Sequence, residues 1–457
     1  MLNLAYVGLK LLWHNKWPRE KIESYAKARF RRVVEHAFYN SRFYRELYRS
    51  VGITEKDLAY LEPSDLPIIN KDVVRANFED ICTVKHLPAG LRSQVEKQRG
   101  EQDAHDSRLI VRLGRYTLVH TSGSTGKPCN FLYNDSAITQ VVANMVRLSL
   151  GGKAKIRLWD FPVRVLFVAS VGRGYASTTL ALNGIKKYNA KSLILNVQDP
   201  LESWPEKIQE FDPNYLAGYP SCIQIVADMQ AKGSIHIRPK KVITGGEPIT
   251  VERARYFQEV FGCDIIDYYA CTESLALGAG ASWYDGIYLF DDMNYCEVDE
   301  FGRLIVTVLY NEVFPLIRYR LNDVVLGFTR GPVGPLPYTR IDKVLGRSED
   351  MMWFRNPAGK WDFLHPLFID DLNVPGIKEF QFVQVNEISF RLRIVPEPGT
   401  NGESLTEKAR EQVNAFLTRK NLSNVKFSVD LTDSLDVDKI SGKVKLVVGA
   451  LKPGSDF

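Results

Sequence analysis

The sequence lacks the cysteine and histidine patterns that hold structural metals or perform redox chemistry. Its six cysteines form no Cys-x-x-Cys pair and no Cys/His cluster at zinc spacing; they are Cys82, Cys129, Cys222, Cys263, Cys271 and Cys296. Structural zinc sites and thioredoxin-like centres need those spacings, so both classes are excluded. We therefore expect free thiols, as in a protein of the reducing cytoplasm.

The sequence also has little net charge and no long apolar run. The formal net charge is only +5, and no Lys/Arg stripe interleaved with aromatic residues occurs, which argues against a nucleic-acid partner. Residues 1–13 are mostly apolar, but this run is too short to span a bilayer and lacks a basic leader with a cleavage site. We expect a helix docked on the body of the protein, and a helix lying on a membrane surface is the alternative.

What the sequence does contain is the alternation of strand and helix patterns typical of an α/β protein. Its 457 residues are enough for two or three domains. Four apolar segments have the composition of buried strands: 163–170, 192–197, 241–244 and 264–269. Between them, Ser221 is expected to cap a helix that ends at Gly233, and Thr250 one that ends at Gly262.

The two ends of the chain differ from this middle part. Residues before about position 75 carry helical spacing with many charged side chains, which predicts a helical cap. The pattern becomes β-rich from residue 290 and changes again near residue 346. Beyond that point, the sequence predicts a small α+β domain. Its expected elements are a hairpin at 379–395, a helix at 406–419 and a strand at 426–431.

The most distinctive stretch is the loop Thr121-Ser122-Gly123-Ser124-Thr125-Gly126-Lys127-Pro128. Its glycines let backbone amides converge on anionic oxygens, and its hydroxyls and lysine add donors, which is the chemistry of holding a polyphosphate. It is not a Walker A sequence, because only two residues separate Gly123 from Gly126 and a proline follows the lysine. A plain turn is the alternative. Strand patterns at 116–120 and 130–133 place the loop at a hairpin tip.

Five further motifs follow the loop in order: G-G-E-P at 245–248, Y-Y-A-C-T-E at 268–273, R-Y-R-L-N-D at 318–323, G-R-S-E-D at 346–350 and S-G-K at 441–443. The first two close predicted strands, at the edge where α/β sheets bind ligands. Together with the loop, these motifs resemble the adenylate-forming superfamily. Within it, the chain is most similar to the phenylacetate-CoA ligase branch and its relatives in capsular polysaccharide synthesis.

The resemblance implies a fold and a reaction. A large N-terminal domain of stacked α/β sheets with a β-rich subdomain would span residues 1–345, a hinge would lie at 346–350, and a small mobile α+β lid would follow at 351–457. The chain would be an adenylate-forming ligase in which a carboxylate attacks ATP and releases pyrophosphate. The acyl group of the resulting acyl-AMP would then pass to an acceptor, with CoA as the acceptor in the phenylacetate branch.

The resemblance also implies roles for individual residues around the phosphates and the ribose. Thr272 would contact the α-phosphate, Glu273 would hold Mg²⁺, and Lys443 would stabilise charge in the transition state. Asp323 would bind the ribose with support from Arg347, and Asp350 would be the hinge. The loop residues would close on the β- and γ-phosphates; they are Thr121, Ser122, Gly123, Ser124, Thr125, Gly126 and Lys127.

The same resemblance places the adenine and acyl pockets. Gly245, Gly246 and Glu247 would line the adenine pocket, and Tyr269 would stack on the base. The walls of the acyl pocket would be Ser170, Tyr219, Pro220 and Tyr268. The ligands would be a small-molecule carboxylate and its acceptor, bound by a monomer or a homodimer.

Several of these side chains have a structural interpretation as well. Glu273 is also typical of a helix N-terminus, Tyr269 and Tyr219 of a core, and Arg347 of a surface ion pair. Lys443 lies between two other lysines, as on a solvated basic face. Cys271 has no histidine partner in its motif, so we interpret it as a small buried side chain and not as a nucleophile.

The acceptor is the part of the reaction that the sequence leaves open. Beyond the predicted hinge, a bulky aromatic segment at 351–361 replaces the glycine-containing turn that CoA ligases place there, and Ala270 and Asn322 replace family glycines. An amine acceptor, which would give an amide, is therefore an alternative to CoA. A nucleotide-binding module without catalysis and a phosphotransferase are the other hypotheses.

Overall fold

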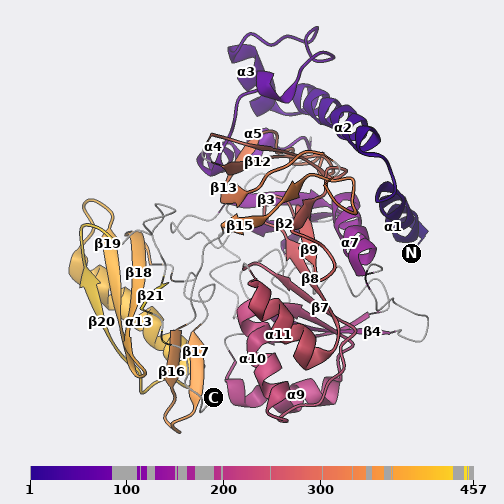
Figure 1. Cartoon of the computed structure of the whole chain (residues 1–457). Helices are drawn as coiled ribbons and strands as arrows, with labels where there is room; N and C mark the ends of the chain where they lie inside the picture. The colour runs from indigo at the N-terminus through magenta and orange to yellow at the C-terminus, as the bar shows by residue number, and fades with distance from the viewer. Residues whose placement is uncertain are drawn as a thin grey trace.

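The computed structural model describes residues 2–84, 111–113, 115–120, 129–149, 152, 162–169, 190–196, 199–247, 249–300, 302–331, 333–345, 352–364, 372, 374–435, 447–449 and 451. A large α/β body carries a helical N-terminal region along one edge, and a smaller α+β unit lies beside it (Figure 1). The predicted fold class is confirmed. None of the helices in the described residues is long and apolar enough to cross a membrane.

Helices dominate the first 81 residues. They are α1 (Leu2–His14), α2 (Arg19–Asn40), α3 (Arg42–Ser50), α4 (Lys71–Ala76) and α5 (Phe78–Ile81). The break between α2 and α3 falls at Ser41, whose hydroxyl accepts a hydrogen bond from the Tyr44 amide and so caps the second helix. Helix α1 packs beside α7 (Asp135–Ser149), as expected for a docked helix (Figure 1).

The largest sheet in the described residues has the order β14-β10-β9-β8-β7-β6-β4-β5. Its parallel half consists of β4 (Val163–Ala169), β5 (Ala190–Asn196), β6 (Tyr215–Gly218), β7 (Lys241–Gly245) and β8 (Asp264–Tyr269). The antiparallel half consists of β9 (Gly278–Ala281), β10 (Ile287–Leu289) and β14 (Arg340–Ile341). All four segments predicted as buried strands are therefore strands.

Helices cover both faces of this sheet. Successive residues of a strand point to opposite faces, and Ile265 of β8 packs with α10 (Pro220–Ala231) and α11 (Val251–Phe261), whereas Ile266 packs with α7. The Thr250 hydroxyl caps α11 and Gly262 ends it, as predicted. Ser221 does not cap α10, contrary to our expectation. Tyr219 is the N-cap residue and Pro220 begins the helix, a position that proline favours.

Two smaller sheets adjoin the large one. The first contains β1 (Val111–Leu113), β2 (Tyr116–His120) and β3 (Asn130–Asn134). The second contains β11 (Asn294–Val298), β12 (Arg303–Val308), β13 (Tyr319–Leu326) and β15 (Lys343–Leu345). This second sheet is the β-rich region expected beyond residue 290.

The C-terminal unit combines a hairpin, a four-stranded sheet and one helix. The hairpin pairs β16 (Met352–Arg355) with β17 (Trp361–Leu364). The sheet has the order β20-β19-β18-β21, from β18 (Ile377–Asn386), β19 (Ser389–Pro396), β20 (Lys426–Leu431) and β21 (Val447–Val448). Helix α13 (Gly402–Arg419) begins four residues before its predicted start, because the Asn401 side chain caps the Ser404 amide.

Candidate nucleotide and acyl site

The phosphate-loop prediction can be placed through its flanking strands. His120 of β2 pairs with Asn130 of β3, so the loop between them joins two antiparallel neighbours, as predicted. The loop itself, Thr121 to Lys127, lies outside the described residues. The first described residue after it, Cys129, lies beside α4, where its thiol approaches the backbone oxygen of Lys71 at 3.9 Å.

The Gly245-Gly246 turn closes β7 and fits only because these residues lack side chains. Gly246 has φ +83°, and a Cβ there would lie 3.0 Å from the Tyr219 ring. A Cβ on Gly245 would lie 2.8 Å from the Tyr268 carbonyl oxygen. The backbone of this turn therefore lies against the Tyr219 ring and the Tyr268 backbone, which belong to two of the predicted pocket residues.

Glu247, the next residue, ties this turn to helix α10. Its Oε1 accepts a hydrogen bond from the Ser221 hydroxyl at 2.8 Å, and its Oε2 accepts one from the Ser221 amide at 3.0 Å. A carboxylate is favourable at a helix N-terminus, where it meets unpaired N–H groups. Glu247 therefore fixes the position of Tyr219 and Pro220 relative to Gly246.

Tyr269 and Asp323 meet across two sheets. The Tyr269 hydroxyl, at the end of β8, donates a hydrogen bond of 2.8 Å to Asp323 Oδ2 on β13. Burial raises the pKa of the Tyr269 hydroxyl well above its usual value, and the negative charge of Asp323 raises it further. The hydroxyl therefore stays protonated and remains a donor. The residues predicted to contact the base and the ribose therefore lie together.

Thr272 and Glu273 are held in place by two tyrosines that sequence analysis did not single out. The Tyr133 hydroxyl on β3 lies 2.8 Å from the Thr272 carbonyl oxygen and 2.9 Å from that of Glu273. The Tyr319 hydroxyl on β13 donates a hydrogen bond of 3.0 Å to Glu273 Oε1. Strands of three sheets therefore converge on this short segment.

The electrostatics of Glu273 suit a site that receives a cation. Burial raises the pKa of its carboxyl, whereas its backbone amide and the Tyr319 hydroxyl lower it. The positive charge of Lys71 at the start of α4 also lowers this pKa, and the negative charge of Asp323 raises it. Two carboxylates and a lysine therefore share the site, and the lysine had no motif of its own that could have indicated it.

Tyr268 is anchored on the α7 side of the sheet. It is only 8% exposed, and its hydroxyl donates to the Leu275 carbonyl oxygen at 2.8 Å and accepts from the Asn144 amide at 3.4 Å. Asn144 in turn accepts a hydrogen bond from the buried guanidinium of Arg147. The Tyr268 side chain is therefore fixed on the α7 side of the sheet, and its backbone pairs with Gly245.

Four of the predicted site residues lie outside the described residues, so their roles stay predictions; they are Ser170, Arg347, Asp350 and Lys443.

All six cysteines are free thiols. Burial raises the pKa of the Cys271 thiol well above its usual value, in keeping with a structural side chain and not a nucleophile.

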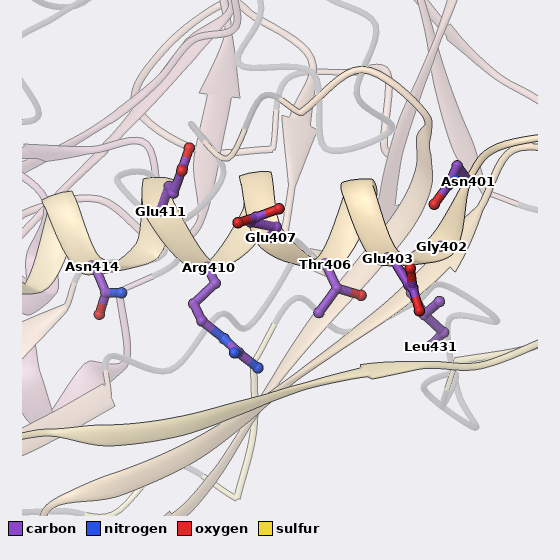
Figure 2. Close-up of a pocket in the computed structure, with 9 residues that line it drawn as sticks. All are labelled: Asn401, Gly402, Glu403, Thr406, Glu407, Arg410, Glu411, Asn414 and Leu431. Atoms are coloured by element: carbon purple, nitrogen blue, oxygen red, sulfur yellow. The ribbon is translucent and has the colours of Figure 1, made fainter.

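A separate groove lies on the C-terminal unit, along one face of α13 (Figure 2). It encloses about 950 Å³, and its lining includes Glu403, Glu407, Glu411, Arg410 and Leu431 of β20. Among the described residues, none that is predicted to bind nucleotide or acid lines it. The candidate site is therefore the one at the ends of β7 and β8, and not this groove.

Comparison with known proteins identifies the family of the region that carries these residues. The family model described as "AMP-binding enzyme" matches residues 71–297. Residues 71–297 form an AMP-binding enzyme domain. This range contains the predicted phosphate loop, the Gly245-Gly246 turn and Glu273, so the resemblance to the adenylate-forming superfamily is confirmed and the chain is an adenylate-forming ligase. Asp323 and the C-terminal unit lie beyond the matched range.

Relatives of the AMP-binding domain include two curated proteins and a solved structure. The phenylacetate-coenzyme A ligase of Pseudomonas putida is 26% identical over 348 residues, which cover 72% of this chain and 71% of that protein. Protein CapK of Staphylococcus aureus is 22% identical, over 72% of this chain and 68% of that protein. A structure of 2-hydroxyisobutyryl-CoA ligase with 2-HIB-AMP and CoA matches with a TM-score of 0.58 at 19% identity, covering 95% of this chain and 91% of that one.

Proposed function

We propose that this protein activates a carboxylic acid as acyl-AMP, releases pyrophosphate and passes the acyl group to the thiol of CoA. The observation that carries the proposal is the meeting of Tyr269, Asp323 and Glu273 at the edge of the sheet in an AMP-binding domain. That edge is where open α/β sheets bind their ligands. The similarity to a phenylacetate-coenzyme A ligase favours CoA as the acceptor.

Several of the described residues have a task in this scheme. The Gly245-Gly246 turn admits the adenine ring beside Tyr219, and Tyr269 stacks on the base while it orients Asp323. Asp323 accepts hydrogen bonds from the ribose hydroxyls through the carboxylate oxygen that Tyr269 does not use. Tyr268 forms part of the acyl wall. Binding and orientation supply most of the catalysis, because two anionic reactants must be brought together.

Magnesium fits the chemistry of the site. No group of three metal-ligating side chains occurs among the described residues, but Mg²⁺ is usually held by one or two carboxylates together with the substrate's phosphates. Glu273 supplies such a carboxylate, and the cation would neutralise charge on the phosphates. Lys71 lies near enough to Glu273 to lower the pKa of its carboxyl, and we propose that it adds a second positive charge there.

The decisive experiment is exchange of labelled pyrophosphate into ATP with a panel of carboxylic acids. We expect exchange only when an accepted acid is present, and we expect Lys443→Ala to reduce it at least ~100-fold if Lys443 stabilises the transition state. Lys445→Ala is the matched control, because it removes a neighbouring lysine outside the motif. Formation of ADP in place of AMP would contradict the proposal and indicate a phosphotransferase.

The acceptor is tested separately from adenylation. With the accepted acid, we expect AMP release to accelerate on addition of CoA, with a thioester as the product. Acceleration by simple amines alone, with an amide as the product, would replace CoA by an amine. The aromatic hairpin β16–β17, which stands where CoA ligases have a glycine-containing turn, is the feature that favours this second acceptor.

A further inference from the structure

Helix α1 has two faces of different character. Leu4, Val7 and Leu11 point inward and pack against the hydrophobic core that contains α7. The opposite face is also apolar, where a surface helix would ordinarily be polar. Tyr6, Leu9 and Trp13 on that face are 68%, 68% and 60% exposed. Their spacing of three and four residues places them in one stripe along the helix.

The charged side chains of α1 and of the turn that follows it, as far as Arg19, are basic. Lys10 and Lys16 are exposed, and no acidic residue occurs before Glu20. The Lys21 ammonium group at the start of α2 lies 5.1 Å from the centre of the Trp13 ring and 4.1 Å from that of Trp17. Tryptophan, tyrosine and lysine together are the residues that proteins place at the boundary between lipid and water.

The helix is also held rigidly to the body of the protein. His14 at its end lies 2.8 Å from Asp292 Oδ2, which also accepts a hydrogen bond of 2.8 Å from the Arg147 guanidinium of α7. These three side chains are almost wholly buried. The exposed stripe therefore stands on a fixed helix at the edge of the molecule, on the opposite side from the C-terminal unit (Figure 1).

We propose that the outer face of α1 binds an anionic phospholipid surface, with Tyr6, Leu9 and Trp13 inserted among the head groups and Lys10, Lys16 and Lys21 against lipid phosphates. Charge complementarity identifies the occupant, since an apolar stripe flanked by the ammonium groups of Lys10, Lys16 and Lys21 matches a surface of negative charge over hydrocarbon. The helix is too short to cross a bilayer and lies along its surface. The enzyme would then work beside the membrane.

The test is co-sedimentation of the full-length protein with vesicles. We expect binding to vesicles of phosphatidylcholine with one quarter phosphatidylglycerol, and about tenfold weaker binding to phosphatidylcholine alone. Trp13→Glu and Leu9→Glu should each weaken binding to the anionic vesicles by about tenfold or more, because each replaces an inserted apolar side chain with a negative charge. The double variant Lys10→Gln/Lys16→Gln should lose most of the preference for anionic lipid.

Tyr60→Glu is the matched control, since Tyr60 is 82% exposed but lies in another part of the chain. It should bind vesicles like the wild type. Thermal melting verifies that every variant folds, and pyrophosphate exchange without lipid should be unchanged, because none of these residues lies in the nucleotide site. The proposal is overturned if the wild type does not bind anionic vesicles or if Trp13→Glu and Tyr60→Glu bind equally. It is also overturned if light scattering shows that Trp13→Glu dissociates a dimer while lipid binding is unaffected.

Discussion

At the scale of single residues, tyrosine hydroxyls hold the two carboxylates of the candidate site. Tyr319 donates to Glu273, and Tyr269 donates to Asp323. Burial raises the pKa of both phenols, so both remain protonated donors at neutral pH. A hydrogen bond donated to a carboxylate stabilises its ionised form, which is the form that binds a cation.

Tyr319→Phe tests this arrangement. Removal of the hydroxyl takes away a stabilising contact of the ionised carboxylate and raises the pKa of Glu273 further. A hydrogen bond to a charged group contributes about 1.5–3 kcal/mol, so its loss favours the protonated carboxyl. The acid limb of the pH profile of pyrophosphate exchange should move measurably to higher pH, because a protonated Glu273 cannot hold Mg²⁺.

Tyr48→Phe is the control for this experiment. Tyr48 is also buried, but its hydroxyl has no hydrogen-bond partner among the described residues. Its replacement should leave the pH profile unmoved. An unchanged acid limb in Tyr319→Phe would show that Glu273 does not bind the cation in its ionised form.

At the scale of elements, much of the α/β core could be predicted from the sequence. Strand β8 has its predicted bounds, 264–269, because a short apolar run between turn residues has few alternatives. The predicted N-cap of α10 was wrong. Ser221 has a side chain that can cap a helix, but its hydroxyl donates to Glu247, a residue 26 positions away. Long-range contacts of this kind leave no local signal.

The docking of α1 on the body of the protein was predicted from the sequence, but the side chains that anchor it were not. Asp292 accepts hydrogen bonds from Arg147 of α7 and lies against His14 of α1. Burial alone would raise the pKa of Asp292, but the charge of Arg147 and the contact with His14 outweigh it and lower the pKa. A carboxylate with a lowered pKa contributes stability above its unfolded pKa, and that stability is lost as the pH falls through the folded value.

Asp292→Asn should therefore destabilise the protein by about 3 kcal/mol at pH 7, because it leaves Arg147 as a buried charge without its counterion. The difference from the wild type should begin to shrink below about pH 4, where the unfolded wild type takes up a proton at Asp292, and it should be lost only as the pH falls through the lower pKa of the folded protein. Urea unfolding at pH 7 and at a series of pH values below 4 measures this. Asp285→Asn is the control, since Asp285 pairs with Arg340 but its side chain is 94% exposed, and it should cost less than ~1 kcal/mol.

At the scale of the whole molecule, the C-terminal unit shares a hydrophobic cluster with helices α9 (Trp204–Phe211), α10 and α11. A buried ionic contact lies in the same boundary. The Lys420 ammonium group donates to Asp362 Oδ1 at 2.7 Å and to the Asp199 carbonyl oxygen at 2.8 Å, and the Leu201 amide lies 3.4 Å from Asp362 Oδ2. We call these four residues the interdomain tether.

Motifs predicted the nucleotide site but not this tether. The glycine turn and the acidic residues follow directly from short sequence patterns, whereas Tyr133, Tyr319 and Lys71 join the site only through the way three sheets pack. Lys420 and Asp362 are likewise brought together by tertiary structure. A lone lysine after a helix is ordinarily solvated, and nothing near it in the sequence indicates that it is buried here.

The tether bears on the domain movement predicted at the hinge. Lys420→Met combined with Asp362→Leu removes both charges, and replacement of a buried ion pair by apolar side chains is often close to neutral for stability. Release of the tether should shift the balance between domain arrangements. We therefore expect pyrophosphate exchange and acyl transfer to change several-fold in opposite directions, because each half-reaction needs its own arrangement.

Both half-reactions are measured on one preparation, with thermal melting to verify the fold. The control is Lys360→Ala, which breaks the pair of Lys360 with Glu202 across the same boundary. That pair is 3.1 Å long but its side chains are 66% and 47% exposed, so solvent screens it and both rates should stay within about twofold of the wild type. Equal loss of both half-reactions in the double variant would mean that the tether supports only stability. Unchanged rates would mean that the boundary between the two units does not open during the reaction.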